Sequence, residues 1–248
     1  PTFWPRVLML ENYLTAFTTA NLGRLFVNTM IVGLVSAVIV MIVGSIYGAI
    51  SGLVGGKVDI FMMRIVDIIY SVPEILLIVV IKMVISEPLQ NLIDTVPAFH
   101  GLQKIGSGLI AIFIVYGCLY WVGMARIVRG QILQLKTLDF VTAAEALGCG
   151  RATMIKEHLL PNCIGQLIAT VMLQIPSAIF TEAFLSYLGI GVSAPMASLG
   201  SLTSEALNGI TTYPYRVIFP AALISLIILS FNLFGDGLRD ALDPKMKK

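Results

Sequence analysis

The chain has 248 residues, of which 57% are hydrophobic and only 12% are charged, and its mean hydropathy is +0.92. Because soluble domains carry about 25% charged residues, a soluble fold of this size is excluded, and we predict an all-α, polytopic membrane protein. The formal net charge of +2 decides little by itself, since membrane topology depends on where Lys and Arg lie. We expect no nucleic-acid partner.

Residues 1–25 mix aromatic and charged side chains, which is typical of an external segment at the membrane interface. The sequence begins at Pro1 rather than at a methionine, so we expect further residues upstream. The rest, 26–248, reads as one transmembrane domain.

Five apolar segments in that domain are long enough to cross a bilayer, which takes about 20 residues. They are 26–54, 68–86, 105–125, 166–188 and 217–235. The first predicted span carries glycines at steps of four, which are Gly44, Gly48, Gly52 and Gly56. We expect this small-residue ridge to let a second helix approach closely. Pro176 interrupts the fourth span.

Three ionisable side chains fall inside predicted spans, where charge is costly and usually faces the interior of the helix bundle. Lys82 lies near the end of its span, so we expect its amine to snorkel to the membrane surface. Glu74 and Glu182 each have two interpretations, as structural partners or as residues of a transport pathway. We place Glu182 near the outer mouth of such a pathway.

The stretch 140–162 is polar and charged but still helical in pattern. Strong helix formers at 143–147 are followed by Gly148 and Gly150, after which a second helical run continues until Pro161. We predict two short helices joined by a glycine hinge, forming a docking element on the membrane surface.

The distribution of positive charge orients the predicted spans. Placing the loop 129–164 in the cytoplasm puts most of the lysines and arginines on the same side, namely Lys57, Arg64, Arg126, Arg129, Lys136, Arg151, Lys156, Arg239, Lys245, Lys247 and Lys248. By the positive-inside rule, the carboxyl end is then cytoplasmic, and the loop 189–215 and the amino end are external.

No stretch of the sequence matches a catalytic, nucleotide-binding or metal-binding motif in both its residues and its predicted surroundings. The cysteines at 118, 149 and 163 and the histidines at 100 and 158 have no zinc or redox spacing, so we expect no metal site. The sequence at 55–58 ends like a phosphate-binding loop but lacks its Ser or Thr, and Ser51 stands where glycine is needed. The G-x-G-x-x-A stretches at 106–111 and 189–194 lie at predicted membrane edges. We therefore expect no catalytic residue here, and no ATP hydrolysis by this chain alone.

The polar stretch resembles the cytoplasmic "EAA" loop of ABC importer permeases, whose pattern is Glu-Ala-Ala, three residues, Gly, nine residues, a hydrophobic residue, a spacer and Leu-Pro. The residues that fit are Ala143, Ala144, Gly148, Leu160 and Pro161. Thr142 occupies the glutamate position and His158 the hydrophobic one. The resemblance implies a contact with the ATPase through Thr142, Ala143, Ala144, Glu145, Gly148, Arg151, Leu160 and Pro161.

In that contact, we expect the small Ala143, Ala144 and Gly148 to let the helix press into a groove on the ATPase. Glu145 is expected to supply the missing carboxylate, and Thr142 to cap the following helix.

Three further stretches resemble the C-type subunit of dipeptide and oligopeptide importers. These are 64–73, 182–192 and 236–244, and the whole similarity runs from about 25 to 245. Nickel importer permeases share much of the pattern. The resemblance implies one further span upstream and a permease that forms half of a peptide pathway in the cytoplasmic membrane of a bacterium.

The implied partners are a second similar permease subunit, two cytoplasmic ATPases that hold ATP and Mg, and an external substrate-binding protein. This chain itself is expected to bind no cofactor. Two other classes remain open. An ion-coupled secondary transporter or channel would use Glu74 and Glu182 but leaves the docking element unexplained, and a non-transporting assembly or signalling subunit is the third interpretation.

Overall fold

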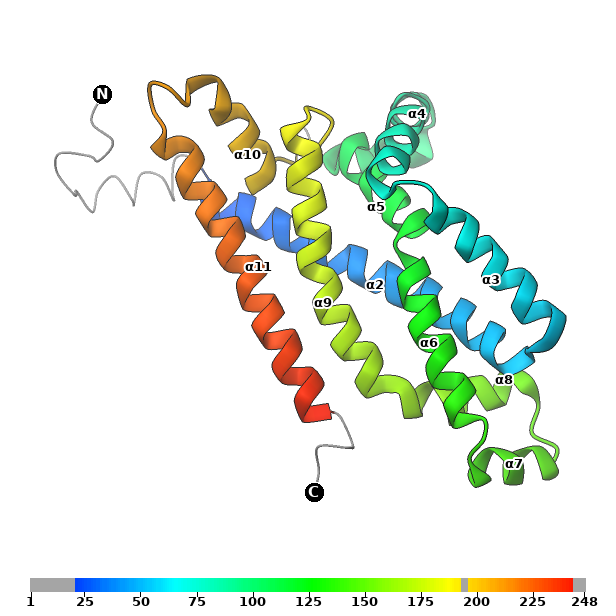
Figure 1. Cartoon of the computed structure of the whole chain (residues 1–248). Coiled ribbons are helices and arrows are strands. Elements are labelled where there is room, and N and C mark those ends of the chain that lie inside the picture. Colours follow the sequence, from blue (N-terminus) through cyan, green and yellow to red (C-terminus); the bar gives the residue numbers. More distant parts are fainter. Residues whose placement is uncertain (1–20, 193–195, 243–248) are drawn as a thin grey trace. The chain divides into compact units, whose positions relative to one another are not determined.

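A computed structural model describes residues 21–192 and 196–242 of the chain, and these residues form helices and connecting loops without a strand. Five helical stretches are long and apolar enough to cross a membrane. They are α2 (Leu22–Val54), α4 (Glu74–Thr95), Ser107–Leu135, Arg151–Tyr187 and α11 (Tyr215–Leu242) (Figure 1). The predicted all-α fold with five spans is confirmed.

Two of these five stretches consist of more than one helix, and shorter helices connect the five stretches. The third stretch consists of α5 (Ser107–Leu119) and α6 (Trp121–Leu135), and the fourth of α8 (Arg151–Thr153), the π-helical turn η2 (Met154–Leu159) and α9 (Leu160–Tyr187). The connecting helices are α3 (Gly56–Ser71), η1 (Pro97–Lys104), α7 (Asp139–Ala146), α10 (Leu199–Ala206) and η3 (Leu207–Gly209).

The described residues fall into two compact units. Unit 1 contains 21–36, 79–114 and 175–231 apart from the gap at 193–195, and unit 2 contains 37–78, 115–174 and 232–242. Helices α2, α4, α5, α9 and α11 contribute residues to both units.

The predicted second span, 68–86, is misplaced. Helix α3 ends at Ser71, and α4 begins at Glu74. Val72 between them is extended, with φ −95° and ψ 138°, because the ring of Pro73 excludes the α region for the preceding residue. The predicted polar loop 87–104 is instead helical, as α4, which contains Pro88, and then η1.

Two further predictions about prolines are wrong. Pro161 does not end a helix and Pro176 does not interrupt one, since the helix is continuous from Arg151 to Tyr187. Pro161 follows the π-helical turn, in which bonds skip five residues rather than four. The side-chain amide of Asn162 donates to the carbonyl of His158 at 2.6 Å, which adds a hydrogen bond where the π-helical turn meets α9.

The glycine ridge of α2 is confirmed for three of its four members, all in unit 2. Gly44, Gly48 and Gly52 face α6 so closely that a Cβ on Gly48 would overlap the carbonyl oxygen of Ala125. Gly56 is not part of the ridge, because it lies beyond the end of α2 and starts α3 with φ +57°. Small residues therefore let α2 and α6 pack backbone to backbone.

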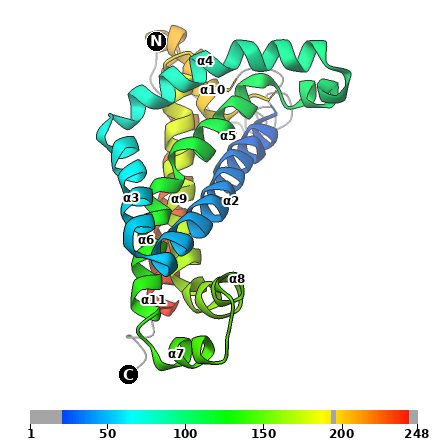
Figure 2. The same ribbon diagram turned by 90° about the vertical axis from the view of Figure 1, so that its right-hand side faces the viewer.

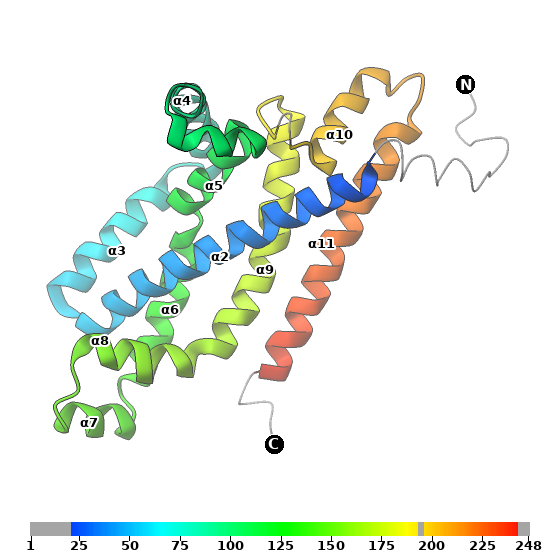
Figure 3. The same cartoon turned by 180° about the vertical axis from the view of Figure 1, so that it is seen from behind.

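Helix α3 packs against α6 in the same unit, and the two helices lie side by side in Figures 2 and 3. The core between them contains Val66 of α3 with Trp121, Val122 and Ala125 of α6. The ring of Tyr47 in α2 lies 4.4 Å from that of Trp121, centroid to centroid. These contacts bind three helices into one apolar layer.

In unit 1, the segment before α10 is held to α2. The Asn28 amide donates to the carbonyl of Ala197 at 2.6 Å, and the Thr29 hydroxyl accepts from the N–H of Leu199 at 3.0 Å. The first turn of α10 is therefore anchored to α2.

The predicted interfacial segment, 1–25, lies mostly outside the described residues, and α2 already begins at Leu22. The last predicted cytoplasmic residues, 243–248, also lie outside.

Candidate functional site: the coupling segment

We call residues 136–160, between α6 and α9, the coupling segment. It contains the predicted pair of helices, α7 and the run that starts with α8, and α7 contacts η2. Figures 2 and 3 show α7 and α8 together beyond the end of α6. The first short helix and the glycine hinge are therefore confirmed, whereas the second helix is not short, because it continues to Tyr187.

Gly148 ends α7 for a backbone reason. Its φ is +83°, a region that residues with a Cβ rarely adopt. The N–H of Gly148 bonds to the carbonyl of Glu145 at 2.9 Å, and that of Cys149 bonds to the carbonyl of Ala144 at 3.0 Å. This pair of bonds is the Schellman motif, which satisfies the carbonyls that a helix end leaves free.

The two faces of α7 differ. Val141 and Ala144, three residues apart, share the buried face, and Met154 and Leu159 of η2 are buried as well. Ala144 is thus buried within this chain, and its contact with the ATPase stays a prediction. The exposed residues of the segment include Thr142, Ala143, Glu145, Leu147, Gly148 and Arg151.

Leu147 is 89% exposed, the highest exposure among the large hydrophobic residues described. Thr142 lies inside α7, and Gly150 precedes α8 without a side-chain cap, so the predicted capping role of Thr142 is wrong. Leu160 and Pro161 open α9, where Leu160 is half-buried and Pro161 exposed.

The ionisable residues of the predicted spans have three different environments. Glu74 is exposed at the first position of α4. Glu182 is fully buried in unit 1, where its Oε1 accepts hydrogen bonds from Ser186 at 2.8 Å and Ser198 at 2.7 Å. The interpretation of Glu182 as a structural partner gains a specific geometry, whereas its pathway role stays a prediction.

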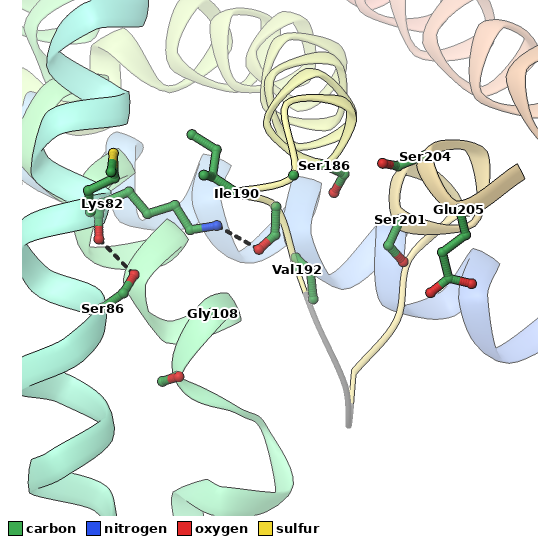
Figure 4. Close-up of a pocket in the computed structure, with 13 residues that line it drawn as sticks. Lys82, Ser86, Gly108, Ser186, Ile190, Val192, Ser201, Ser204 and Glu205 are labelled. Atoms are coloured by element: carbon green, nitrogen blue, oxygen red, sulfur yellow. Dashed lines mark hydrogen bonds between the residues drawn. The ribbon is translucent and has the colours of Figure 1, made fainter. Parts of the chain in front are cut away.

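Lys82 does not snorkel. It is 3% exposed, and its Nζ donates to the carbonyl of Gly191 at 2.6 Å (Figure 4). The segment after α9 turns back through Gly189, at φ +78°, and brings that carbonyl to the amine. The prediction failed because the acceptor lies 109 residues away in the sequence.

A cavity of about 480 Å³, lined by both polar and apolar residues, lies in unit 1 between α4, α5, the segment after α9 and α10 (Figure 4). Several of its hydroxyls already donate within the chain: Ser86 to the carbonyl of Lys82, Ser186 to Glu182 and Ser201 to the carbonyl of Ser198. These hydroxyls stabilise unit 1 by bonding within the chain, so they do not indicate a ligand.

The coupling segment and the spans have counterparts in known proteins. Residues 41–248 match the family model described as "Binding-protein-dependent transport system inner membrane component". The chain belongs to this family. Members are permease subunits of ABC transporters, so this chain is a multi-pass protein of the bacterial inner membrane that works with ATP-binding and substrate-binding components.

Two relatives from Bacillus subtilis (strain 168) are similar over most of this chain. The chain is 42% identical over 240 residues to the oligopeptide transport system permease protein OppC, covering 94% of this chain and 72% of the relative. It is 40% identical over 241 residues to the dipeptide transport system permease protein DppC, covering 94% and 69%.

The fold also matches a chain of the MetNI methionine ABC transporter in inward-facing conformations, with a TM-score of 0.64. The match covers 95% of this chain and 100% of that chain, at 19% identity. At this identity, the match confirms the permease fold and nothing about substrate.

Sequence reasoning missed one group of polar contacts in this permease. Asp59 of α3 accepts hydrogen bonds from Arg129 of α6 and from Ser51 near the end of α2. The available signal was an acidic and a basic residue that each lie in a connection between predicted spans, on the same predicted side of the membrane. Their pairing depends on which helices are adjacent, which the sequence pattern does not show.

Proposed function

We propose that this chain is the C-type permease subunit of an importer for dipeptides and oligopeptides, and that it forms half of the translocation pathway. The observation that carries the proposal is the exposed surface at the carboxyl end of α7. This surface includes Leu147 and Gly148, which follow the helix and lie outside the spans. Identities of 42% and 40% to permeases named for oligopeptides and dipeptides favour peptides as the substrate.

The partners in this proposal are a second, homologous permease subunit, two ATPases that bind ATP and Mg, and an external binding protein that delivers the peptide. The coupling segment and the carboxyl end face the cytoplasm, an orientation that the distribution of Lys and Arg supports. Specificity resides largely in the binding protein, because no residue of this chain is recognisable as a peptide ligand.

ATP binding draws the two ATPases together and displaces α7. Because the helix from Arg151 to Tyr187 is continuous, its first turns can carry that displacement into a span. The permease then exchanges between outward-open and inward-open states, whose populations nucleotide and the loaded binding protein shift.

Vesicles containing the complete complex test the function. They should accumulate intact peptide only when ATP and the binding protein are both present. Uptake of nickel chelates without peptide uptake would instead support a nickel importer. Peptide uptake driven by an ion gradient without ATP would refute the ABC assignment.

A further inference from the structure

A two-point ion pair joins α3 to α6 in unit 2. The Nε and Nη2 atoms of Arg129 donate to the two carboxylate oxygens of Asp59 at 2.5 and 2.6 Å. Ser51 donates its hydroxyl to the same carboxylate, and Asp59 is only 8% exposed. A guanidinium that binds a carboxylate through two parallel bonds fixes the orientation of both side chains, unlike a point charge.

A second polar contact lies at the end of α6, where the coupling segment begins. Lys136, the residue after α6, directs its Nζ at the carbonyls of Gly52 and Leu53, at 3.5 and 3.3 Å. These carbonyls belong to the last turn of α2, where a cation is electrostatically favoured. The start of the coupling segment is therefore held to the end of α2, about two turns of α6 beyond Arg129.

Stability alone does not explain the pair. The apolar layer of Val66, Trp121, Val122 and Ala125 already joins α3 to α6. Burying an ion pair often stabilises a fold no better than apolar side chains of similar size. What the pair adds is a fixed orientation of α6 relative to α3, because its two parallel bonds form at only one rotation of α6.

We propose that Asp59 and Arg129 are positioning residues for the coupling segment. They fix the rotation of the last turns of α6 against α3, so that a displacement of α7 moves both helices instead of bending the short link 136–138. This inference rests on the proposed function, in which α7 receives its displacement from the ATPase.

The test uses the complete complex with its ATPases and binding protein. The measured quantity is the ratio of ATP hydrolysis with and without peptide-loaded binding protein, in complexes purified after assembly. In Asp59→Asn and Arg129→Gln, we expect basal hydrolysis to remain and stimulation to fall roughly tenfold, which corresponds to about 1.4 kcal/mol of activation free energy. Arg129→Lys keeps the charge but loses the two-point contact, so it should not restore stimulation.

The matched control is Arg126→Gln. Arg126 pairs with Asp67 between the same two helices at 2.8 Å, but the side chains are 41% and 56% exposed. Exposed pairs of this kind contribute little, so stimulation should stay near the wild-type ratio. An equal loss in Arg126→Gln and Arg129→Gln would overturn the positioning role.

A double variant separates positioning from stability and also covers the case in which single variants fail to assemble. Asp59→Leu with Arg129→Met replaces the pair by apolar side chains that can still pack. We expect it to assemble and hydrolyse ATP at the basal rate with weak stimulation. Wild-type stimulation in this double variant would show that the pair serves stability only. A wild-type complex that shows no stimulation at all would refute the proposed function instead.

Discussion

Because α2 and α6 lie so close together, we expect a single added methyl group to destabilise the folded permease. In Gly48→Ala, the new Cβ would overlap the carbonyl oxygen of Ala125 and lie 2.9 Å from the Cβ of Val128 and 3.0 Å from the backbone nitrogen of Arg129. Two of these three atoms belong to the backbone and cannot rotate away, so the helices must separate.

The expected size of the effect combines two opposing terms. Overpacking costs about 1–3 kcal/mol, and backbone obstacles place this site at the upper end. Replacing glycine by alanine inside a helix returns about 1 kcal/mol. The net destabilisation is therefore about 2 kcal/mol, which lowers the unfolding midpoint by roughly 4–8 °C for a chain of this length.

The assay is thermal unfolding of the permease in detergent, with Gly130→Ala as the matched control. Gly130 lies in α6, and a Cβ there would meet nothing within 4 Å. We expect this control to be as stable as the wild type or slightly more stable. Equal midpoints for Gly48→Ala and the wild type, or an equal loss in Gly130→Ala, would refute the close-packed ridge.

Three further predictions concern the polar sites. Leu147→Ser should leave insertion and thermal stability unchanged but reduce co-purification of the ATPases, because this side chain is 89% exposed and buries little surface against the described residues. Full recovery of the ATPases would contradict a contact at this edge. Hydrogen bonds from Arg129 hold the pKa of the Asp59 carboxyl below its usual value, so the pair stabilises the fold above the unfolded-state pKa of about 3.9 and loses this contribution as pH falls through the lower folded-state pKa. The stability difference between wild type and Asp59→Asn, measured by unfolding, should therefore stay constant from about pH 8 to 5 and shrink only below about pH 4; a difference that vanishes by pH 6 would contradict the pairing. Glu182→Gln keeps an oxygen that accepts hydrogen bonds from both serine hydroxyls, so this variant should insert normally. Glu182→Ala leaves two buried hydroxyls without an acceptor, which should cost about 1–3 kcal/mol each in unfolding assays, and equal stability of the two variants would show that these bonds are unimportant. Altered peptide uptake or altered pH dependence of uptake in Glu182→Gln would support the pathway role.

The sequence by itself determined the properties that depend on a short stretch of chain. Apolar runs identified the number of spans, although not the bounds of the second, because crossing the bilayer requires local hydrophobicity and helical hydrogen bonding. The end of α7 at Gly148 was also predictable, since only glycine adopts its positive φ without strain. The ridge of Gly44, Gly48 and Gly52 was visible because residues four apart share one face of a helix.

The tertiary structure alone decided the contacts between distant residues. Arg129 and Asp59 are 70 residues apart, and Lys82 and Gly191 are 109 apart, so each pairing depends on which helices are neighbours and how they are rotated. The same reason explains the prolines. Pro161 looked like a helix end in isolation, but it follows a π-helical turn and the helix continues. Local rules give the preference of a residue, and the packing around it decides whether that preference prevails.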